Sequence, residues 1–358
     1  MNNKTKNIVV TILFSTILIS FLTINIITKD EEISLSERRK LQQFPELTIK
    51  SLLKGTFFKE FDTYTTDQFI KRDEFRKIKV NLELKFKKNY NNLYTYQDYI
   101  IKQTFPLNEK SVNNLTNKMN TLKNNYFKNN NTYYTIAPDK NYFINNGNLR
   151  LDYTKLTNIM QNNLKDFKYI DIFNTLSLED YYKTDTHWKQ ENLPKVIDVL
   201  KKEMNFKANT TYIEEPITSF KGVYAKQLPI KTTTETIKVL TNNTIKNSKT
   251  YNYETKKETT IYDLDKIKSQ DKYDIYLSGA VSLIEINTNI SNNKELIVFR
   301  DSYGSSLIPL LAEGYSKITV IDTRYISPKL LINYVEFENK DILFVYGIIS
   351  INNSASIR

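Results

Sequence analysis

The chain has 358 residues, with 51 lysines and arginines against 40 aspartates and glutamates, one histidine, seven glycines and no cysteine. A chain of this length forms one large domain or two modest ones and can bury a hydrophobic core. The lack of cysteine excludes disulfides, cysteine nucleophiles and thiolate metal sites, and the single histidine excludes sites built from two imidazoles. Neither a G-x-G-x-x-G nor a P-loop pattern occurs, so sites that cradle nucleotide phosphates are not expected. No cofactor and no metal ion are predicted.

The formal net charge of +11 raises the question of nucleic-acid binding. The lysines are spread along the whole chain among Asn, Ile and Tyr and are not gathered in one basic segment. This distribution argues against a nucleic-acid partner and favours attraction to an anionic envelope surface.

The N-terminal segment is apolar and uncharged from residue 7 to residue 28. About 20 apolar residues are enough for a helix to cross a bilayer. Lys4 and Lys6 precede the segment, so the positive-inside tendency places residues 1–6 in the cytoplasm and the chain after about Lys29 outside. A cleaved signal peptide is the alternative, but no A-x-A-like site follows the apolar stretch. We expect an uncleaved, single-pass signal anchor in the cell membrane.

Residues 29–93 are predicted to form a membrane-proximal helical lead without chemistry of its own. Apolar side chains there recur at mixed three- and four-residue steps, with Lys, Glu and Asp between them. These apolar residues are Leu52, Leu53, Phe57, Phe58, Phe61, Phe69, Phe75 and Ile78.

Residues 94–358 are predicted to form one extracytoplasmic α/β domain. Short apolar runs alternate with helical stretches, a pattern typical of a parallel sheet with crossover helices. The region from about 214 to 271 is rich in Thr, Lys and Asn, and is predicted to be an insertion or a peripheral β element. The predicted strands are Tyr133–Ala137, Tyr169–Phe173, Asp274–Leu277, Glu295–Phe299, Lys317–Asp322 and Asp341–Tyr346, and the predicted helices are Tyr153–Leu164, Ser305–Ala312 and Pro328–Phe337.

Three of the predicted strands end in loops that carry polar residues or glycine. These loops are Ser278-Gly279, Asp301-Ser302 and Thr323-Arg324. In a parallel sheet the carboxyl ends of the strands meet at one edge, where functional sites gather. We therefore expect the three loops to converge.

The only histidine, His187, follows Asp185 by two residues and precedes Trp188. At this spacing the Asp185 carboxylate can bind imidazole Nδ1, which fixes the tautomer and stabilises the imidazolium as in a catalytic triad. Trp188 would shield the pair from water. The alternative is an ordinary hydrogen-bonded histidine in a loop.

Ser302 follows an apolar strand and precedes a helical segment that begins near Gly304. A hydroxyl at a helix N-terminus lies where backbone N–H groups and the helix dipole favour a developing negative charge. Serine is also a routine helix N-cap, so Ser302 alone leaves both roles open. Together with the Asp-x-His pair and the parallel sheet, the nucleophile is favoured. Because no G-x-S-x-G occurs, an α/β-hydrolase elbow is not expected.

Asp185-Thr186-His187-Trp188 and, far downstream, Arg300-Asp301-Ser302-Tyr303 resemble the D-x-H-W and D-S blocks of the SGNH-like polysaccharide O-acetyltransferases. The similarity is to the DHHW-type branch, which is related to the alginate O-acetyltransferases of bacterial envelopes. Together with further segments, the resemblance covers nearly the whole chain beyond the anchor. These segments are Ser36-Glu37-Arg38-Arg39-Lys40-Leu41, Gly55-Thr56-Phe57-Phe58, Asp67-Gln68-Phe69, Arg72-Asp73, Ala137-Pro138-Asp139-Lys140 and Asp322-Thr323-Arg324-Tyr325.

The resemblance implies a flavodoxin-like SGNH fold in circularly permuted order, with the Asp/His block ahead of the nucleophile. It implies that Ser302 is the nucleophile, His187 the general base and Asp185 the residue that orients the base. Arg324 matches an arginine near the acceptor or the oxyanion, with a surface arginine at a strand end as the alternative. The other residues expected near the substrate or the oxyanion are Gly279, Tyr303 and Trp188.

Two positions depart from the family pattern. SGNH enzymes usually complete the oxyanion hole with a Gly and an Asn side chain, whereas Ser278-Gly279-Ala280 lacks the amide. Losing one oxyanion donor can cost roughly 3 kcal/mol of transition-state stabilisation. Either another donor fills the position, or the activity is slow, or the site has become a binding site. Thr186 stands where a literal DHHW motif has its second histidine, a change that alginate-type enzymes tolerate.

The predicted reaction is acetyl transfer through an acetyl-serine intermediate onto hydroxyls of a cell-surface polysaccharide. Acetyl-CoA does not occur outside the membrane, so the resemblance implies that a multipass membrane acyltransferase donates the acetyl group. A carbohydrate esterase would use the same triad with water as the acceptor. A non-catalytic glycan-binding or assembly protein of the envelope would not need Ser302. A teichoic acid D-alanylation factor shares the general fold, but the D-x-H-W block argues against it.

Overall fold

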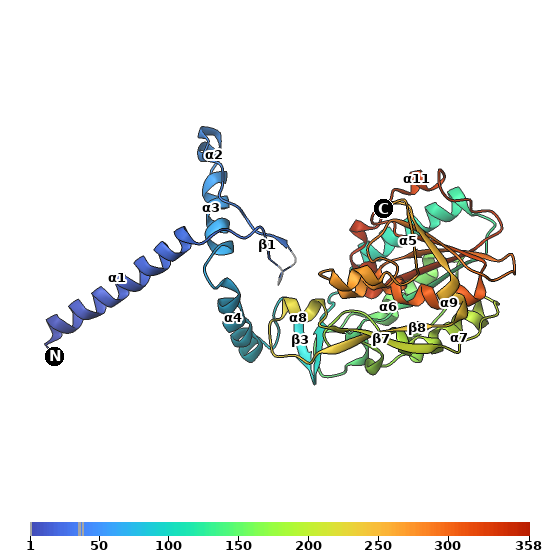
Figure 1. Cartoon of the computed structure of the whole chain (residues 1–358), viewed down its shortest axis with the longest axis horizontal. Coiled ribbons are helices and arrows are strands. Elements are labelled where there is room, and N and C mark those ends of the chain that lie inside the picture. The colour runs from blue at the N-terminus through green and yellow to red at the C-terminus, as the bar shows by residue number, and fades with distance from the viewer. Residues whose placement is uncertain (1, 35–36, 38) are drawn as a thin grey trace. The chain divides into compact units, whose positions relative to one another are not determined.

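The computed structural model describes residues 2–34, 37 and 39–358, and it divides into two compact units (Figure 1). The smaller unit comprises Met1–Tyr90 with Lys226–Lys231, and the larger unit comprises Asn91–Ala225 and Thr232–Arg358. Ser36 and Arg38, which contribute to the family resemblance, lie outside the described residues.

The smaller unit begins with α1, a helix long and apolar enough to cross a membrane. None of its residues is buried against the rest of the protein. In the described part of this unit, three further helices and a short two-stranded ribbon follow. The elements of this unit are α1 (Asn3–Ile27), β1 (Ile33–Ser34), β2 (Arg39–Lys40), α2 (Ile49–Leu53), α3 (Thr56–Asp67) and α4 (Arg72–Lys87).

Asp67, at the end of α3, is a buried acid. Its Oδ2 accepts hydrogen bonds from Arg39 Nη1 at 2.8 Å and from the backbone N–H of Gln42 at 2.9 Å. The hydrogen bond from Arg39 outweighs burial and lowers the pKa of Asp67. This contact ties the end of α3 to β2, so two of the segments that resemble the family lie against each other.

In the larger unit eight strands form one sheet in the order β10-β9-β11-β13-β12-β14-β5-β6. The five strands from β13 to β6 are parallel, which confirms the predicted α/β architecture, and β11, β9 and β10 add an antiparallel edge. Two hairpins lie outside the sheet, β3 (Leu93–Tyr96) with β4 (Tyr99–Lys102) and β7 (Ile213–Phe220) with β8 (Glu235–Thr241). The strands of the sheet are β5 (Thr132–Ala137), β6 (Lys168–Tyr169), β9 (Lys249–Asn252), β10 (Lys257–Thr259), β11 (Leu283–Asn287), β12 (Glu295–Arg300), β13 (Lys317–Ile321) and β14 (Asp341–Gly347).

The central strands of this sheet are apolar on both faces. In β12, Leu296 and Val298 belong to one buried cluster, whereas Ile297 and Phe299 belong to another. Successive side chains of a strand point to opposite faces, so both faces of the sheet are covered. This explains the uninterrupted apolar runs in the sequence, which are typical of strands buried on both sides.

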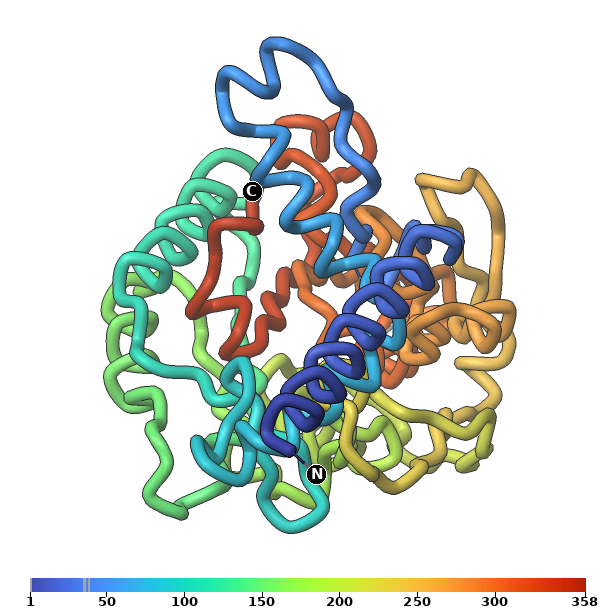
Figure 2. The backbone as a smooth tube through the Cα atoms, turned by 90° about the vertical axis from the view of Figure 1, so that its left-hand side faces the viewer, coloured from blue at the N-terminus to red at the C-terminus, as the bar shows by residue number. Residues whose placement is uncertain are grey.

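Helices supply the outer layers. Leu115 of α5 and Leu156 of α6 pack in the cluster of Phe299, whereas Val196 of α7 and Leu307 of α10 pack in the cluster of Val298. Figure 2 traces the chain from α1 in dark blue to the orange and red C-terminal elements. The helices of the larger part of the chain are α5 (Glu109–Tyr126), α6 (Tyr153–Asn163), α7 (Pro194–Glu203), α8 (Val223–Gln227), α9 (Asn243–Asn247), α10 (Ser302–Leu307), α11 (Pro328–Leu331) and α12 (Ile348–Asn352).

Some predicted elements are wrong. Asp274–Leu277 is not a strand, because Lys272–Ile275 forms a short 3₁₀ helix and β11 begins only at Leu283. A short apolar run does not distinguish a strand from a buried helical turn by its periodicity. The helix predicted over Ser305–Ala312 changes from α to 3₁₀ after Leu307, because Pro309 lacks the N–H that an α-helix needs. Of Tyr169–Phe173 only Tyr169 pairs in the sheet, and α11 ends at Leu331, before Phe337.

Asp67→Asn is expected to destabilise the smaller unit by about 1–3 kcal/mol, because it removes the charge that accepts the Arg39 hydrogen bonds. Since folding lowers the pKa of Asp67, its stabilisation is present at neutral pH and is lost as the pH falls through that pKa. Hydrogen exchange of the α3 amides in detergent micelles measures the effect. The exposed Glu60 of the same helix gives the matched control, Glu60→Gln. Equal exchange in the two variants at neutral pH would contradict the prediction.

Candidate active site

Ser302 is the first residue of α10, directly after the carboxyl end of β12. The N-cap of α10 is the preceding residue, Asp301, whose Oδ1 accepts from the N–H of Tyr303 at 3.0 Å. The other oxygen of Asp301 accepts from the N–H of Gly347 at 2.8 Å. Asp301 thus takes the capping role that the sequence left open for Ser302, and the Ser302 hydroxyl is free for another contact.

That contact is with His187. The two residues are 115 positions apart, and His187 Nε2 lies 2.8 Å from Ser302 Oγ. His187 Nδ1 lies 2.6 Å from Asp185 Oδ1. A carboxylate only accepts, so Nδ1 carries the proton, and the Nε2 of a neutral imidazole accepts from the Ser302 hydroxyl. The three side chains that the sequence singled out form one hydrogen-bonded chain.

The Asp185 carboxylate is fully buried. Burial by itself raises the pKa of Asp185, but the electrostatic attraction of the His187 ring and the hydrogen bonds to the carboxylate outweigh it and hold the pKa below its ordinary value. The hydrogen bonds come from His187 Nδ1, from the backbone N–H of His187 at 3.0 Å, and from the N–H of Val223 at 2.8 Å. Asp185 is therefore an ionised acceptor that orients the imidazole.

Aromatic side chains fix the imidazole from the sides. The ring of Tyr273 stacks on that of His187 with centroids 3.9 Å apart and planes 6° from parallel. Trp188 is fully buried and donates from Nε1 to Ser306 Oγ at 3.0 Å, and Tyr273 donates to the same oxygen at 2.7 Å. The Tyr303 hydroxyl donates to the carbonyl of Thr186 at 2.8 Å. Trp188 and Tyr303 thus support the loop that carries His187.

Arg300 joins the three loops that were expected to converge. It is fully buried at the end of β12 and donates from Nη2 to the carbonyl of Gly279 at 2.7 Å. Its Nη1 lies 3.7 Å from Asp322 Oδ2, at the end of β13. Asp322 in turn accepts from Arg324 Nε at 2.9 Å and Nη2 at 2.6 Å. Burial lowers the pKa of Arg300, and Asp322 opposes that shift.

The structure places Gly279 and Arg324 in hydrogen bonds with Arg300 and Asp322, respectively. Among the described residues no hydrogen bond joins either of them to the Asp185–His187–Ser302 chain. The N–H of Gly279 donates to the carbonyl of Tyr276 at 3.1 Å, and its φ of +78° continues a left-handed turn that begins at Leu277. Their roles at the oxyanion or the acceptor stay predictions.

Tyr273, Ser306, Gly222 and Arg300 support the site but were not identified from the sequence as site residues. Arg300 belongs to the Arg300-Asp301-Ser302-Tyr303 block, which was a usable signal. Gly222 and Tyr273 had no such signal in the sequence. Only the fold brings Gly222 to Asp185 and Tyr273 to His187. Within the part of the chain that the structure describes, no group of three or more His, Asp or Glu side chains is arranged to hold a metal ion.

No protein-family model matches the chain, and no curated protein matches its sequence. Solved structures match its fold. A DHHW family protein from Eubacterium siraeum superposes with a TM-score of 0.60 at 18% identity, over 75% of this chain and 95% of that one. The chain has the fold of that DHHW family protein. It also superposes on Bacillus cereus PatB1.

The PatB1 structure with a sulfonyl adduct gives a TM-score of 0.54 at 17% identity, over 72% of this chain and 95% of that one. A second PatB1 structure gives 0.53 at 15% identity, over 72% and 96% of the two chains. The predicted resemblance to the DHHW type is thus confirmed for the fold. Chemistry on a shared fold depends on the residues at the site, which here are those of this chain.

Gly222→Ala is expected to displace Asp185, because a Cβ at position 222 would lie 2.3 Å from Asp185 Cβ and 2.5 Å from its Oδ2. The displacement lengthens the contact to His187 Nδ1. Nitrogen NMR of protein labelled in histidine reports it directly, since the chain has one histidine. Lys221→Ala, at the exposed residue before Gly222, is the control and should leave the imidazole signals unchanged. Unchanged signals in Gly222→Ala would show that Asp185 does not depend on this close approach.

Proposed function

We propose that this protein is an extracytoplasmic O-acetyltransferase that modifies hydroxyls of a cell-surface polysaccharide. The observation that carries the proposal is the hydrogen-bonded chain from Asp185 through His187 to Ser302 at the carboxyl edge of the sheet. A hydroxyl next to an oriented imidazole is the arrangement that acyl transfer needs. The resemblance of the D-x-H-W and D-S blocks supports acetyl as the group and a glycan as the acceptor.

In the first half-reaction Ser302 Oγ attacks the acetyl carbonyl of the donor, and His187 Nε2 takes the hydroxyl proton. The bond between the acetyl carbon and the donor oxygen then breaks, and the departing oxygen receives that proton. Ser302 now carries the acetyl group as an ester. In the second half-reaction His187 removes the proton of a sugar hydroxyl, whose oxygen attacks the ester. The sugar ester leaves, and the proton returns to Ser302.

Two features of α10 and its surroundings suit the negative charge that develops during both steps. The attacked carbonyl lies at the first turn of α10, where backbone N–H groups favour a negative charge. Ala280 offers no side-chain amide, so the backbone of α10 and Arg324 are the groups proposed to replace the missing donor. Arg324 is held at the carboxyl edge of the sheet by its ion pair with Asp322, which also pairs with Arg300.

The similarity in fold to PatB1 suggests a direct chemical probe. One PatB1 structure contains a sulfonyl adduct. A sulfonyl fluoride reacts with an activated nucleophile, losing fluoride as the nucleophile's oxygen bonds to sulfur. Selective labelling of Ser302 by such a reagent would support its role in this chain.

The proposed setting is the outer face of the cell membrane. α1 is long and apolar enough to span a membrane, and Lys4 and Lys6 precede it. The acetyl donor is proposed to be a multipass membrane acyltransferase, because acetyl-CoA is confined to the cytoplasm. The anchor would hold the chain beside that partner.

Ser302→Ala, His187→Ala and the double variant are each expected to lower glycan acetylation by roughly 10³-fold or more, to a similar residual level, because the two residues act as one unit. Asp185→Asn should leave more activity, since it disturbs the tautomer but removes neither reacting group. Glycan-bound acetate in cells carrying each variant measures this, with protein amounts checked by blot.

The exposed Ser356 provides the matched control, since Ser356→Ala should leave acetylation unchanged. Normal acetylation with Ser302→Ala would contradict a catalytic role of Ser302 and favour the glycan-binding alternative.

A second experiment, in which the purified chain is incubated with acetylated glycan, distinguishes acetyl transfer from hydrolysis. Release of acetate without transfer to a second sugar would mean an esterase.

Protease added to intact protoplasts is expected to digest the chain beyond about Lys29, because the flanking charges of α1 orient it with the N-terminus inside. A cytoplasmic protein in the same cells is the control for intact membranes. Protection of the larger unit would mean the opposite orientation.

A further inference from the structure

We propose that α4 and the loop before it lie in the membrane–water interface, with the apolar face of α4 in the lipid and its lysines among anionic headgroups. The inference rests on α1 crossing a membrane, as proposed above. It gives the smaller unit a second membrane contact, made by residues 69–86, in addition to the anchor.

Two aromatic rings that follow α3 pack on α1 near its C-terminal end. The ring of Phe69 stacks on that of Phe21 with centroids 5.7 Å apart, and Phe75 meets the same ring edge-on at 6.4 Å. The backbone N–H of Ile70 donates to Asn25 Oδ1 at 2.7 Å. This bond satisfies the backbone N–H of Ile70 and the amide oxygen of Asn25, as an apolar environment requires. The start of α4 is therefore attached to the side of α1.

These contacts fix the depth of the loop. Phe21 lies six residues before Ile27, the last residue of α1, which corresponds to about 9 Å along the helix axis. The rings of Phe69 and Phe75 contact α1 at that level. Interfacial helices bury their apolar face roughly 5–10 Å into the headgroup and acyl boundary. With α1 in a bilayer, both rings reach that boundary.

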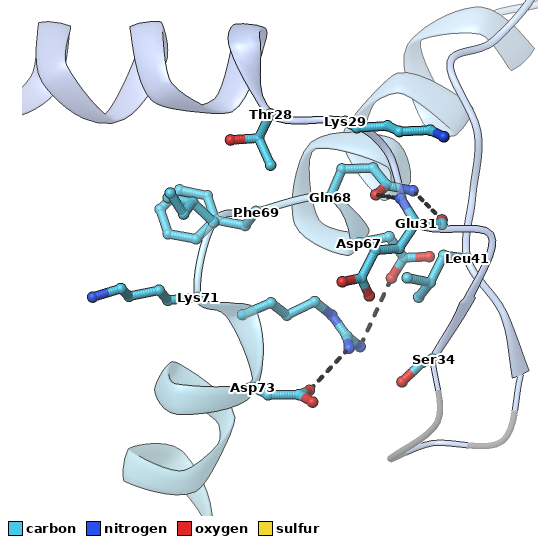
Figure 3. Close-up of a pocket in the computed structure, with 12 residues that line it drawn as sticks. Thr28, Lys29, Glu31, Ser34, Leu41, Asp67, Gln68, Phe69, Lys71 and Asp73 are labelled. Atoms are coloured by element: carbon cyan, nitrogen blue, oxygen red, sulfur yellow. Dashed lines mark hydrogen bonds and ion pairs between the residues drawn. The ribbon is translucent and has the colours of Figure 1, made fainter. Parts of the chain in front are cut away.

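The loop that carries Phe69 is held from its other side (Figure 3). Gln68 accepts from the N–H of Glu31 at 3.0 Å and donates to the carbonyl of the same residue at 3.0 Å, which ties the loop to the segment directly after α1. The residue before Gln68, Asp67, is itself held by the hydrogen bond from Arg39. Gln68 and Phe69 both line a cavity of about 360 Å³, and in Figure 3 Phe69 lies beside the end of α1. The depth of Phe69 is thus set by hydrogen bonds as well as by ring stacking.

From Phe75 onward α4 exposes an apolar face. Phe75, Ile78, Leu82 and Phe86 recur at steps of three and four residues and are 48, 57, 52 and 74% exposed. This spacing places them on one side of the helix, whereas Val80 on the other side is fully buried. In Figures 1 and 3 α4 runs across the direction of α1, the orientation of a helix that lies in the plane of the membrane. The apolar face begins at the residue that touches α1, so it continues the lipid-facing surface of the anchor.

Basic side chains border this face. α4 contains six lysines and arginines against three aspartates and glutamates. Lys79 and Lys85 lie on the two borders of the apolar face by their helical positions. Long lysine side chains lie along an apolar surface and keep the ammonium group at the headgroups. An apolar face bordered by lysines is the composition of helices that bind anionic lipid surfaces.

The lack of cysteine allows one probe at a time to be placed on the full chain. Nitroxide labels on Ile78→Cys and Leu82→Cys report on the apolar face, and a label on Lys77→Cys is the matched control. Lys77 lies two residues from Phe75 and therefore points to another side of the same helix. A label on Leu13→Cys reports on α1. The chain is reconstituted in vesicles of phosphatidylglycerol and phosphatidylcholine, and the collision of each label with oxygen and with a water-soluble nickel chelate is measured.

Labels at Ile78 and Leu82 are expected to show a higher ratio of oxygen to nickel collisions than the label at Lys77. Their ratios should approach the ratio measured for the label at Leu13. Nickel access at Ile78 and Leu82 with lipid protection at Leu13 would overturn the inference and leave the anchor intact. Nickel access at Leu13 would overturn the anchor itself. Protection of Ile78 and Leu82 from both reagents would mean that a protein surface covers the face, which also overturns the inference. In vesicles of phosphatidylcholine alone, a lower ratio of oxygen to nickel collisions at Ile78 would support the proposal that the lysines bind anionic headgroups. A ratio equal to that in the mixed vesicles would overturn that part of the proposal.

Discussion

The larger unit depends on the burial of one carboxylate, that of Asp185. A buried charge is costly unless hydrogen-bond donors surround it. Asp185 obtains them from His187 and from the N–H of Val223, 38 positions further along the chain. Val223 can come that close because its neighbour is Gly222, whose N–H donates to Thr184 Oγ1 at 3.0 Å. The requirement to satisfy Asp185 thus fixes the fold of two separate loops, and His187 takes its orientation from them.

The carboxyl edge of the sheet provides the rigid support for the other half of the site. Asp301 caps α10 and also accepts from Gly347 at the end of β14, so the start of α10 is attached to two neighbouring strands. Arg300 links the same edge to Gly279 and Asp322. Reacting groups on strand and helix ends of a packed sheet are held more precisely than groups on free loops. The 2.8 Å contact of Ser302 with His187 follows from this support.

The smaller unit differs from the larger one in the apolar surface that it leaves exposed. Its helices leave large apolar side chains exposed, among them Leu53 and Phe58 in addition to those of α4. A soluble domain of this size rarely leaves such surfaces in water. An environment that is apolar next to α1 and polar beyond it accounts for both the exposed rings and the surrounding lysines. The proposed acetyl donor is a membrane protein, and an acceptor domain attached to the same membrane at two points would remain beside it.

The sequence by itself determined the long apolar N-terminal helix, the parallel strands of the α/β sheet and the candidate residues Asp185, His187 and Ser302. These features depend on hydrophobic periodicity and on short local patterns, which a sequence displays directly. Only the tertiary structure decided that Asp301, and not Ser302, caps α10. Only the fold, likewise, brought Gly222 to Asp185 and Tyr273 to the imidazole of His187. Contacts between residues far apart in the chain leave no local pattern, because they arise only when packing brings buried polar groups to their partners.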